Sequence, residues 1–351
     1  MDRRTRDHFA GCLLGAAVGD AMGAPVEAMS FAEIQNAFGT HGITYLARAF
    51  GKTGAVTDDT QLTLFTAEGL LRAAGMGLER GECHIPSVMR RAYLRWSGTQ
   101  EEFYYDPEFP AQHDGWLYSI EELHFRRRPG TTCFAALADE RMGTMEDPIN
   151  HSKGCGAVAR AAPIGLVADE PFALGCQIAA LTHGHPSGYL AAGFLAQLMS
   201  EIVNGRELPD AIASARDVLV RWPSHEECLK AVDAAVSLAE RGSSAVDPIG
   251  MIGRGLVAEE ALAISIFCAL TAEDFASGVL RSVNHDGDSD ATGCITGSIL
   301  GVLWGKAAIT EAWLEVIELR EVIEEIAGDL YSCFVEQAPA RVDWKAKYPP
   351  W

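Results

Sequence analysis

The sequence predicts an all-α protein that folds as one domain over residues 1–351. Apolar residues recur at helical spacing in many segments, and the strict alternation typical of half-buried strands is scarce. No tandem repeat, low-complexity block or Ser/Pro linker divides the chain. The expected helices include residues 61–74, 171–181, 189–203, 208–220, 226–240, 258–270, 271–283 and 311–327. Thr271 is expected to cap the helix that follows it, because acidic residues occupy the first turn.

Composition narrows the possible functions. With 351 residues and 48% hydrophobic content, the chain can bury a large core. Its net charge of −20 argues against a nucleic acid or an anionic membrane surface as the main partner, because both would repel it. The charged N-terminus and the short, Gly/Ala-rich stretch that follows predict neither export nor a membrane span. Nine scattered cysteines without a CxxC pair indicate no zinc knuckle or disulfide framework, which favours the cytoplasm.

Two helical segments consist largely of small residues, and one long segment looks irregular. Residues 11–19 and 293–301 are rich in Gly and Ala, so their helices can approach neighbours closely. Residues 97–132 are expected to form a lid-like insertion with short helices of its own. In it, Trp116 or Tyr118 could stack on an adenine or simply pack within the lid. The arginines at 126–128 could bind phosphate or form a solvated face.

The first acidic cluster consists of Thr57, Asp58 and Asp59, directly before a predicted helix. Hard divalent cations such as Mg²⁺ and Mn²⁺ prefer oxygen ligands, and two adjacent carboxylates with a hydroxyl supply them in one turn. The alternative is an ordinary helix cap, which stabilises a helix by about 0.5–2 kcal/mol without binding anything. Taken alone, this cluster is more typical of a helix cap than of a metal site.

The second acidic cluster places Asp286, Asp288 and Asp290 at alternate positions before a glycine-dotted apolar helix. Carboxylates this close repel one another unless a cation or protons neutralise them. The pattern opens like a calcium-binding EF-hand, but the glycine and the late glutamate of that loop are missing. A solvated acidic turn remains the alternative. Asp20 and Glu27, which follow the small-residue helix at 11–19, could likewise be solvated carboxylates at a helix stop.

Two further segments have the composition of ligand sites. Residues 152–156 are glycine-rich beside a helical stretch, where free backbone N–H groups can hold a phosphate; a tight turn with a solvated lysine is the alternative. His183 and His185 flank a glycine, and their alternative role is helix capping.

These elements occur together and in one order, and on that basis the chain resembles the ADP-ribosylglycohydrolase family. The matching segments are residues 11–27, 57–69, 152–158, 162–165, 181–186, 257–262 and 284–301. The resemblance implies an all-α fold whose two acidic clusters converge on two Mg²⁺ or Mn²⁺ ions in a cleft. The metal ligands that it implies are Thr57, Asp58, Asp59, Asp288 and Asp290.

The resemblance also implies roles for other residues. Glu27 matches a mobile glutamate beside the metals and is the candidate base, with Asp59 as the second candidate catalytic residue; Asp20 is expected behind the ligands. The implied substrate-binding residues are Ser152, Gly154, Gly156 and His183. One departure stands out: Ala291 occupies a position where the family usually carries Thr or Ser. Thr292 or a water is expected to replace the missing oxygen, or else one metal position is weaker.

The expected function is hydrolysis of the glycosidic bond between ADP-ribose and an acceptor, with ADP-ribosylated arginine on a protein as the first candidate. The transition state would be oxocarbenium-like, and the two ions could anchor ribose hydroxyls and polarise water. A second possibility is a binding or immunity protein that recognises an ADP-ribosylating toxin or its modified target, with weakened catalysis. A third is a helical scaffold whose acidic turns are only caps.

Overall fold

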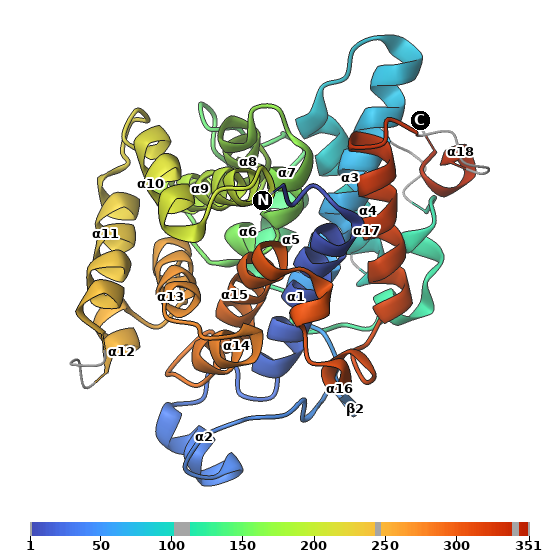
Figure 1. The fold of residues 1–351 in the computed structure, drawn as a ribbon. Helices are drawn as coiled ribbons and strands as arrows, with labels where there is room; N and C mark the ends of the chain where they lie inside the picture. The colour runs from blue at the N-terminus through green and yellow to red at the C-terminus, as the bar shows by residue number, and fades with distance from the viewer. Residues whose placement is uncertain (1, 102–112, 243–246, 339–343, 350–351) are drawn as a thin grey trace.

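The computed structural model describes residues 2–101, 113–242, 247–338 and 344–349, and nearly all of its regular structure is helical (Figure 1). The prediction of an all-α fold is therefore confirmed. The helices are α1 (Arg6–Gly23), α2 (Phe31–Phe38), α3 (Asp58–Arg80), α4 (Ile85–Thr99), α5 (Thr131–Leu137), α6 (Gly156–Ala159), α7 (Ala162–Val167), α8 (Pro171–Ala180), α9 (Pro186–Val203), α10 (Leu208–Leu219), α11 (Glu226–Arg241), α12 (Pro248–Ile252), α13 (Ala258–Leu270), α14 (Phe275–Val283), α15 (Ser289–Trp304), α16 (Glu311–Leu314), α17 (Arg320–Phe334) and α18 (Trp344–Lys347). The 3₁₀ turns are η1 (Leu117–Ser119), η2 (Glu121–His124) and η4 (Lys306–Ala308), and the strands β1 (Arg48–Ala49) and β2 (Lys52–Thr53) form a small hairpin.

Helices α1 and α15 pack against each other at the centre of the molecule, although they lie near opposite ends of the chain (Figure 1). Glycines spaced four residues apart line the contact on both helices: Gly11 faces Gly301, Gly15 faces Gly297, and Gly19 faces Gly293. A Cβ added at any of these positions would lie 1.9–2.4 Å from a backbone oxygen of the other helix. The expectation that the two small-residue helices approach their neighbours closely is thus confirmed, and the structure shows that they are each other's neighbours.

The remaining helices surround this pair. Helices α3 and α17 contact α1, and α4 packs on α3, whereas α13 and α14 contact α15 and lead outward to α11 (Figure 1). Helix α9 contacts α7, α8, α10 and α13. Because α3 begins with the first acidic cluster and α15 with the second, the α1–α15 contact brings both acidic turns to one region.

The predicted helix over residues 271–283 is wrong at its start. Helix α14 begins at Phe275, and its N-cap is Asp274, whose carboxylate accepts a hydrogen bond from Ser277 N at 2.7 Å. Ser277 Oγ in turn accepts from Asp274 N, so the two residues form a capping box. Thr271 instead ends α13, and its carbonyl accepts a hydrogen bond from the Arg281 guanidinium.

The predicted continuous helix over residues 311–327 is also wrong. It is broken into α16 and α17 at Leu319, which has a left-handed φ of 62°. The break lets the Glu318 carboxylate turn inward, where it is 3% exposed and receives hydrogen bonds from Arg127, Lys52 and Val56 N. These charge-assisted contacts stabilise the broken helix more than its continuation as one amphipathic helix would.

The irregular segment over residues 97–132 is described only in part, since residues 102–112 lie outside the described ranges. It carries the two short turns η1 and η2. Trp116 packs edge-on against Tyr348, and Lys347 Nζ lies 3.9 Å from the centre of its ring. Tyr118 Oη is hydrogen-bonded to His113, and its ring meets His124. Both aromatic side chains therefore have the packing role that the sequence left open.

Two findings bear on the predictions from composition. All nine cysteines are free, as the absence of paired spacing indicates. Among the residues that the structure describes, no helix combines the length and apolar character needed to cross a membrane.

A buried ionic cluster joins α3 to α4. Glu68, with a fully buried side chain, lies 3.2 Å from both Arg72 Nη2 and Arg95 Nε. We expect Glu68→Gln to lower the free energy of unfolding by about 3 kcal/mol, because it leaves two buried guanidinium groups short of a counter-charge while Asp114 still pairs with Arg72. Urea unfolding measures this loss. Glu79→Gln on the exposed part of the same helix is the control and should leave the midpoint unchanged.

Candidate active site

The first acidic cluster forms the N-terminus of α3. Thr57 is the N-cap, and its hydroxyl accepts a hydrogen bond from Asp59 N at 3.2 Å. Thr57 therefore caps α3, but the carboxylates of Asp58 and Asp59 take no part in this capping hydrogen bond. Asp58 Oδ2 accepts from Gly130 N at 3.3 Å, and the Asp59 side chain lies buried in the protein at 6% residue exposure.

Asp20 ties this turn to the end of α1. Its fully buried carboxylate accepts hydrogen bonds from Thr57 N at 2.9 Å, from Thr60 N at 3.2 Å and from the Thr60 hydroxyl. Burial raises the pKa of Asp20 to about 6, and these hydrogen bonds oppose the shift. Asp20 thus lies behind the acidic turn and holds it in place.

The second acidic turn is held by backbone contacts from three directions. Gly287 O accepts from Ala28 N at 2.8 Å, which places the residue after Glu27 beside the turn. Asp288 N donates to Arg254 O at 2.9 Å, and the Asn284 side chain bridges both backbone groups of Ile43. Gly287 has a φ of 123°, and a Cβ there would lie 2.0 Å from Arg254 O, so only glycine fits this position.

The two turns meet, and their carboxylates repel one another. Burial raises the pKa of Asp58 to about 8, with Asp20 and Glu27 adding to the shift. Burial and then the charges of Asp58, Asp20, Asp288 and Glu27 hold the pKa of Asp59 well above its usual range. Asp290 behaves alike, because it is buried and faces Asp288, Glu27 and Asp59. The structure therefore brings together four of the five predicted ligands and Glu27, with Thr57 at the base of the first turn.

The chemistry of these donors fits a hard divalent cation. Asp290 Oδ1 is buried without a hydrogen-bond partner, and carboxylates that repel one another are stabilised by a cation. Other members of the cluster point elsewhere: Asp288 Oδ2 accepts from Cys155 Sγ at 2.9 Å, and Glu27 Oε2 pairs with Arg128 Nη1 at 2.7 Å. In the described ranges no three Asp, Glu, His or Cys side chains already stand in ligating positions.

The position of Ala291 is buried, and its neighbour does not replace the missing oxygen. Ala291 is 1% exposed. The Thr292 hydroxyl is hydrogen-bonded to the carbonyls of Ser282 (2.7 Å) and Asp288 (2.8 Å) and to His285 Nε2 (2.9 Å). With these three partners it is committed to the turn itself. These contacts argue against the expectation that Thr292 acts in place of residue 291, whereas Ser289 Oγ is buried without a partner.

The glycine-rich segment at residues 152–156 lies beside the second turn through Cys155. Ser152 Oγ accepts from Gly154 N at 3.3 Å and lies 3.3 Å from Thr132 Oγ1. Gly154 forms a bridge with Val257, and Gly156 begins α6. Lys153 is not a solvated lysine as the alternative supposed, because its ammonium pairs with Glu227 at 2.5 Å and with Glu259.

His183 faces this segment. It is 2% exposed, its Nδ1 lies 2.8 Å from Thr182 Oγ1, and a Cβ added at Gly154 would lie 3.5 Å from its Nε2. Burial and the charge of Arg160 lower the pKa of His183 to about 3, so the ring is neutral. His185, by contrast, is the N-cap of α9 and accepts from Ser187 N, which is the capping role that the sequence left open.

Three site residues were not predicted. Cys155 contacts Asp288, Gly130 contacts Asp58, and Arg128 contacts Glu27. Cys155 lies in the glycine-rich segment at residues 152–156, and Arg128 and Gly130 lie in the irregular segment at residues 97–132. Nothing in the spacing, however, indicates which of the three arginines reaches the acidic cluster.

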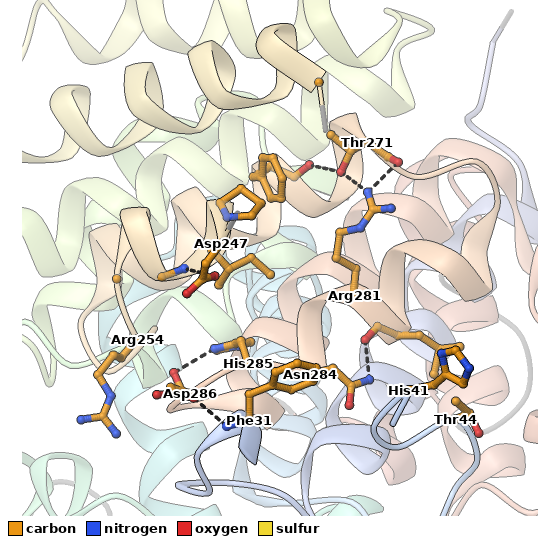
Figure 2. A pocket seen from close by; sticks show the side chains of 17 residues that line it. Phe31, His41, Thr44, Asp247, Arg254, Thr271, Arg281, Asn284, His285 and Asp286 are labelled. Atoms are coloured by element: carbon orange, nitrogen blue, oxygen red, sulfur yellow. Dashed lines mark hydrogen bonds between the residues drawn. The ribbon is translucent and has the colours of Figure 1, made fainter. Parts of the chain in front are cut away.

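A cavity of about 1280 Å³ opens on α14 beside the second turn (Figure 2). Its lining includes Phe31, Arg254, Arg281, His285 and Asp286. Asp286 accepts from Phe31 N at 2.6 Å, so it fixes the start of α2. Asp286 therefore lines this cavity, whereas Asp288 and Asp290 of the same acidic cluster do not.

The raised pKa of Asp20 predicts a specific pH dependence for the metal-free protein. A folded-state pKa of about 6, above the ordinary 3.8, means that the folded state binds more protons in this interval. Stability from this group is therefore lost as pH rises from about 4 to about 6, by ~3 kcal/mol. Urea midpoints of wild-type and Asp20→Asn protein in EDTA measure it. The gap between them should widen in favour of the variant with rising pH; a constant gap would contradict the assignment.

The chain is similar to known proteins over nearly its whole length. The sequence profile of the ADP-ribosylglycohydrolase family matches residues 1–340. The chain is 26% identical over 332 residues to an uncharacterised protein of Archaeoglobus fulgidus, covering 93% of this chain and 96% of that protein. It is 25% identical to the ADP-ribosyl-[dinitrogen reductase] glycohydrolase of Rhodospirillum rubrum, covering 90% and 91%, and 21% identical to the ADP-ribosylarginine hydrolase Tri1 of Serratia proteamaculans, covering 93% and 79%. A solved ADP-ribosylglycohydrolase-related protein complex superposes with a TM-score of 0.64 at 25% identity, covering 93% and 97%.

Proposed function

Because this chain belongs to the ADP-ribosylglycohydrolase family, we propose that it hydrolyses the bond between ADP-ribose and arginine on a modified protein, with two Mg²⁺ or Mn²⁺ ions. The glycohydrolase activity follows from the family. The metal requirement and the arginine linkage are proposals. A protein carrying ADP-ribose is the expected partner, as the names of two relatives suggest for those proteins.

The observation that carries the proposal is the meeting of two acidic turns from distant parts of the chain. Asp59 from α3 and Asp290 from α15 are both buried; the charge of Asp59 raises the pKa of Asp290, and the charge of Asp288 raises the pKa of Asp59. Such repulsion destabilises the protein unless a cation or protons neutralise the carboxylates, and it is therefore typical of functional sites. Two solvated acidic turns or two independent helix caps would have no reason to face each other. Their meeting therefore argues against the hypothesis of a helical scaffold whose acidic turns are only caps.

The residues can be given roles in the reaction. Bound divalent ions would anchor ribose hydroxyls and polarise the attacking water. Thr57, Asp58, Asp59, Asp288 and Asp290 would hold them. Glu27, whose side chain is 25% exposed at the mouth of the cluster, would take the proton from the water as it attacks the anomeric carbon. Neutral His183 can donate or accept one hydrogen bond at Nε2 toward the ribose or phosphates without adding charge.

The linkage is tested by mass spectrometry of released ADP-ribose. Proteins carrying ADP-ribose on arginine, and separately on serine, are incubated with the Mg²⁺-loaded protein. We expect release from the arginine-linked substrate. Release from the serine-linked substrate alone would overturn the arginine assignment and leave the glycohydrolase activity intact.

The metal proposal is tested by isothermal titration of EDTA-stripped protein with Mg²⁺ and Mn²⁺. Two sites per chain, both strengthened by ADP-ribose, are expected. Ala291→Ser restores a hydroxyl at the buried position and should tighten the weaker site by about threefold to tenfold, the effect of one added oxygen ligand worth ~1 kcal/mol. A variant with unchanged affinity at both sites would show that residue 291 does not face an ion.

The loss of the hydroxyl at residue 291, with Thr292 committed elsewhere, favours one alternative function. In it, the protein recognises an ADP-ribosylating toxin or its modified target and protects by occlusion, with weak turnover. Asp58→Asn separates the two functions. Binding and protection that survive this substitution would favour occlusion, and loss of protection together with turnover would favour hydrolysis.

A further inference from the structure

Arg128 is the cation that pairs with Glu27 at the mouth of the acidic cluster. Its Nη1 lies 2.7 Å from Glu27 Oε2, and its charge also interacts with Asp290. The side chain of Arg128 is 56% exposed and that of Glu27 is 25% exposed. An ion pair this open to solvent is weak, so a competing anion can exchange with Glu27 at low cost.

The backbone of Arg128 is fixed in an unusual conformation. Its φ is 55°, in the left-handed region that side-chain-bearing residues avoid. The flanking residues impose this conformation: Arg127 is anchored on the buried Glu318 at 2.9 Å, its carbonyl accepts from Asp58 N, and Gly130 N donates to Asp58. The chain tolerates the strain, and the result is a guanidinium directed over the acidic cluster.

The substrate brings a requirement that Arg128 can meet. ADP-ribose carries a diphosphate, which must approach a cluster of several carboxylates in a protein of net charge −20. Lys153, the cation of the glycine-rich segment, is already bound to Glu227 and Glu259. Arg128 instead has a side chain that is largely open to solvent, and Thr132, four residues on in the same segment, contacts Ser152. A guanidinium pairs with phosphate oxygens more strongly than with a solvated carboxylate.

We propose that Arg128 is a positioning residue that holds Glu27 in the free protein and moves to the diphosphate of ADP-ribose when substrate binds. The exchange releases Glu27 at the moment the anomeric carbon arrives. This inference rests on the proposed function, because it takes ADP-ribose as the ligand and Glu27 as the base.

The test is a double-mutant cycle on ligand affinity, measured by isothermal titration of the full-length, Mg²⁺-loaded protein with ADP-ribose and with adenosine. Arg128→Gln should weaken ADP-ribose roughly tenfold or more and leave adenosine unchanged, because only ADP-ribose has phosphates. Glu27→Gln should tighten ADP-ribose by about twofold to fivefold, because Arg128 is then free beforehand. In the double variant that gain should vanish.

Arg126→Gln is the matched control. Arg126 is exposed in the same segment, and its guanidinium lies 5.2 Å from the Phe134 ring rather than at Glu27. The substitution changes net charge equally and should leave ADP-ribose affinity unchanged.

Two outcomes would overturn the inference while the hydrolase remains established by ADP-ribose release. In one, Arg128→Gln weakens adenosine and ADP-ribose alike, which indicates a structural role. In the other, the gain from Glu27→Gln persists without Arg128, which indicates simple repulsion between Glu27 and phosphate. Failure of the wild-type protein to bind ADP-ribose at all would instead overturn the proposed function, and this inference with it.

Discussion

Asp59→Asn is expected to lower kcat/KM for ADP-ribose release by about 10³-fold or more while making the metal-free protein more stable. The activity falls because the substitution removes a buried carboxylate that the proposed ions need, and such losses cost ~4 kcal/mol of transition-state stabilisation. The stability rises because Asp59 is repelled by Asp58, Asp20, Asp288 and Glu27, and an amide of the same shape is not. We expect a gain on the order of 1–2 kcal/mol in the free energy of unfolding.

Enzyme assays and thermal unfolding in EDTA measure the two effects on one preparation. Asp139→Asn, at a partly exposed carboxylate outside the cluster, is the control and should change neither quantity strongly. A variant that lost activity and stability together would indicate that Asp59 is a structural residue. In that case the first acidic cluster would act only as a helix cap.

Gly297→Ala is expected to destabilise the protein by about 5 kcal/mol, among the largest effects a single methyl group can have. The new Cβ would lie 1.9 Å from Gly15 O and 2.6 Å from the carbonyl carbon of Gly15. Backbone atoms of a central helix cannot move aside as a flexible side chain can, so α1 and α15 must separate. Their separation would also pull Asp290 away from Asp59.

Urea unfolding monitored by circular dichroism measures the loss. Gly77→Ala is the control, because Gly77 lies inside α3 and an added Cβ there meets nothing within 4 Å. That variant should be equally stable or gain up to ~1 kcal/mol from alanine's higher helix propensity. A tolerated Gly297→Ala would show that the central helices do not depend on glycine for their contact.

Much of the fold was predictable because helical periodicity reports burial directly. The segment at residues 258–270 shows this, since α13 spans that range. The errors arose where side chains from distant segments overrode the local pattern. Glu318 breaks the predicted helix at residues 311–327 because Arg127 and Lys52, far away in the sequence, attract it inward. No local pattern contains that information.

The candidate site was predictable only as a set of segments. The two acidic turns could be located because their carboxylates are adjacent or alternate in the sequence, and the resemblance to the family predicted that they meet. The contacts around them could not be predicted. The sequence has three consecutive arginines at residues 126–128, yet Arg127 binds Glu318 and Arg128 binds Glu27. Their difference comes from the left-handed backbone at Arg128, which depends on contacts with α3.

The glycine contact between α1 and α15 has a consequence for how the protein is made. During translation α1 and the first acidic turn leave the ribosome before α15, which is synthesised after eleven further helices of the chain, α4 to α14. Until then the glycine face of α1 has no partner, and Asp58 and Asp59 lack the carboxylates opposite them. A nascent chain released before residue 304 would therefore lack part of the central contact that aligns the site, so the proposed cation site can be completed only after α15 has been synthesised.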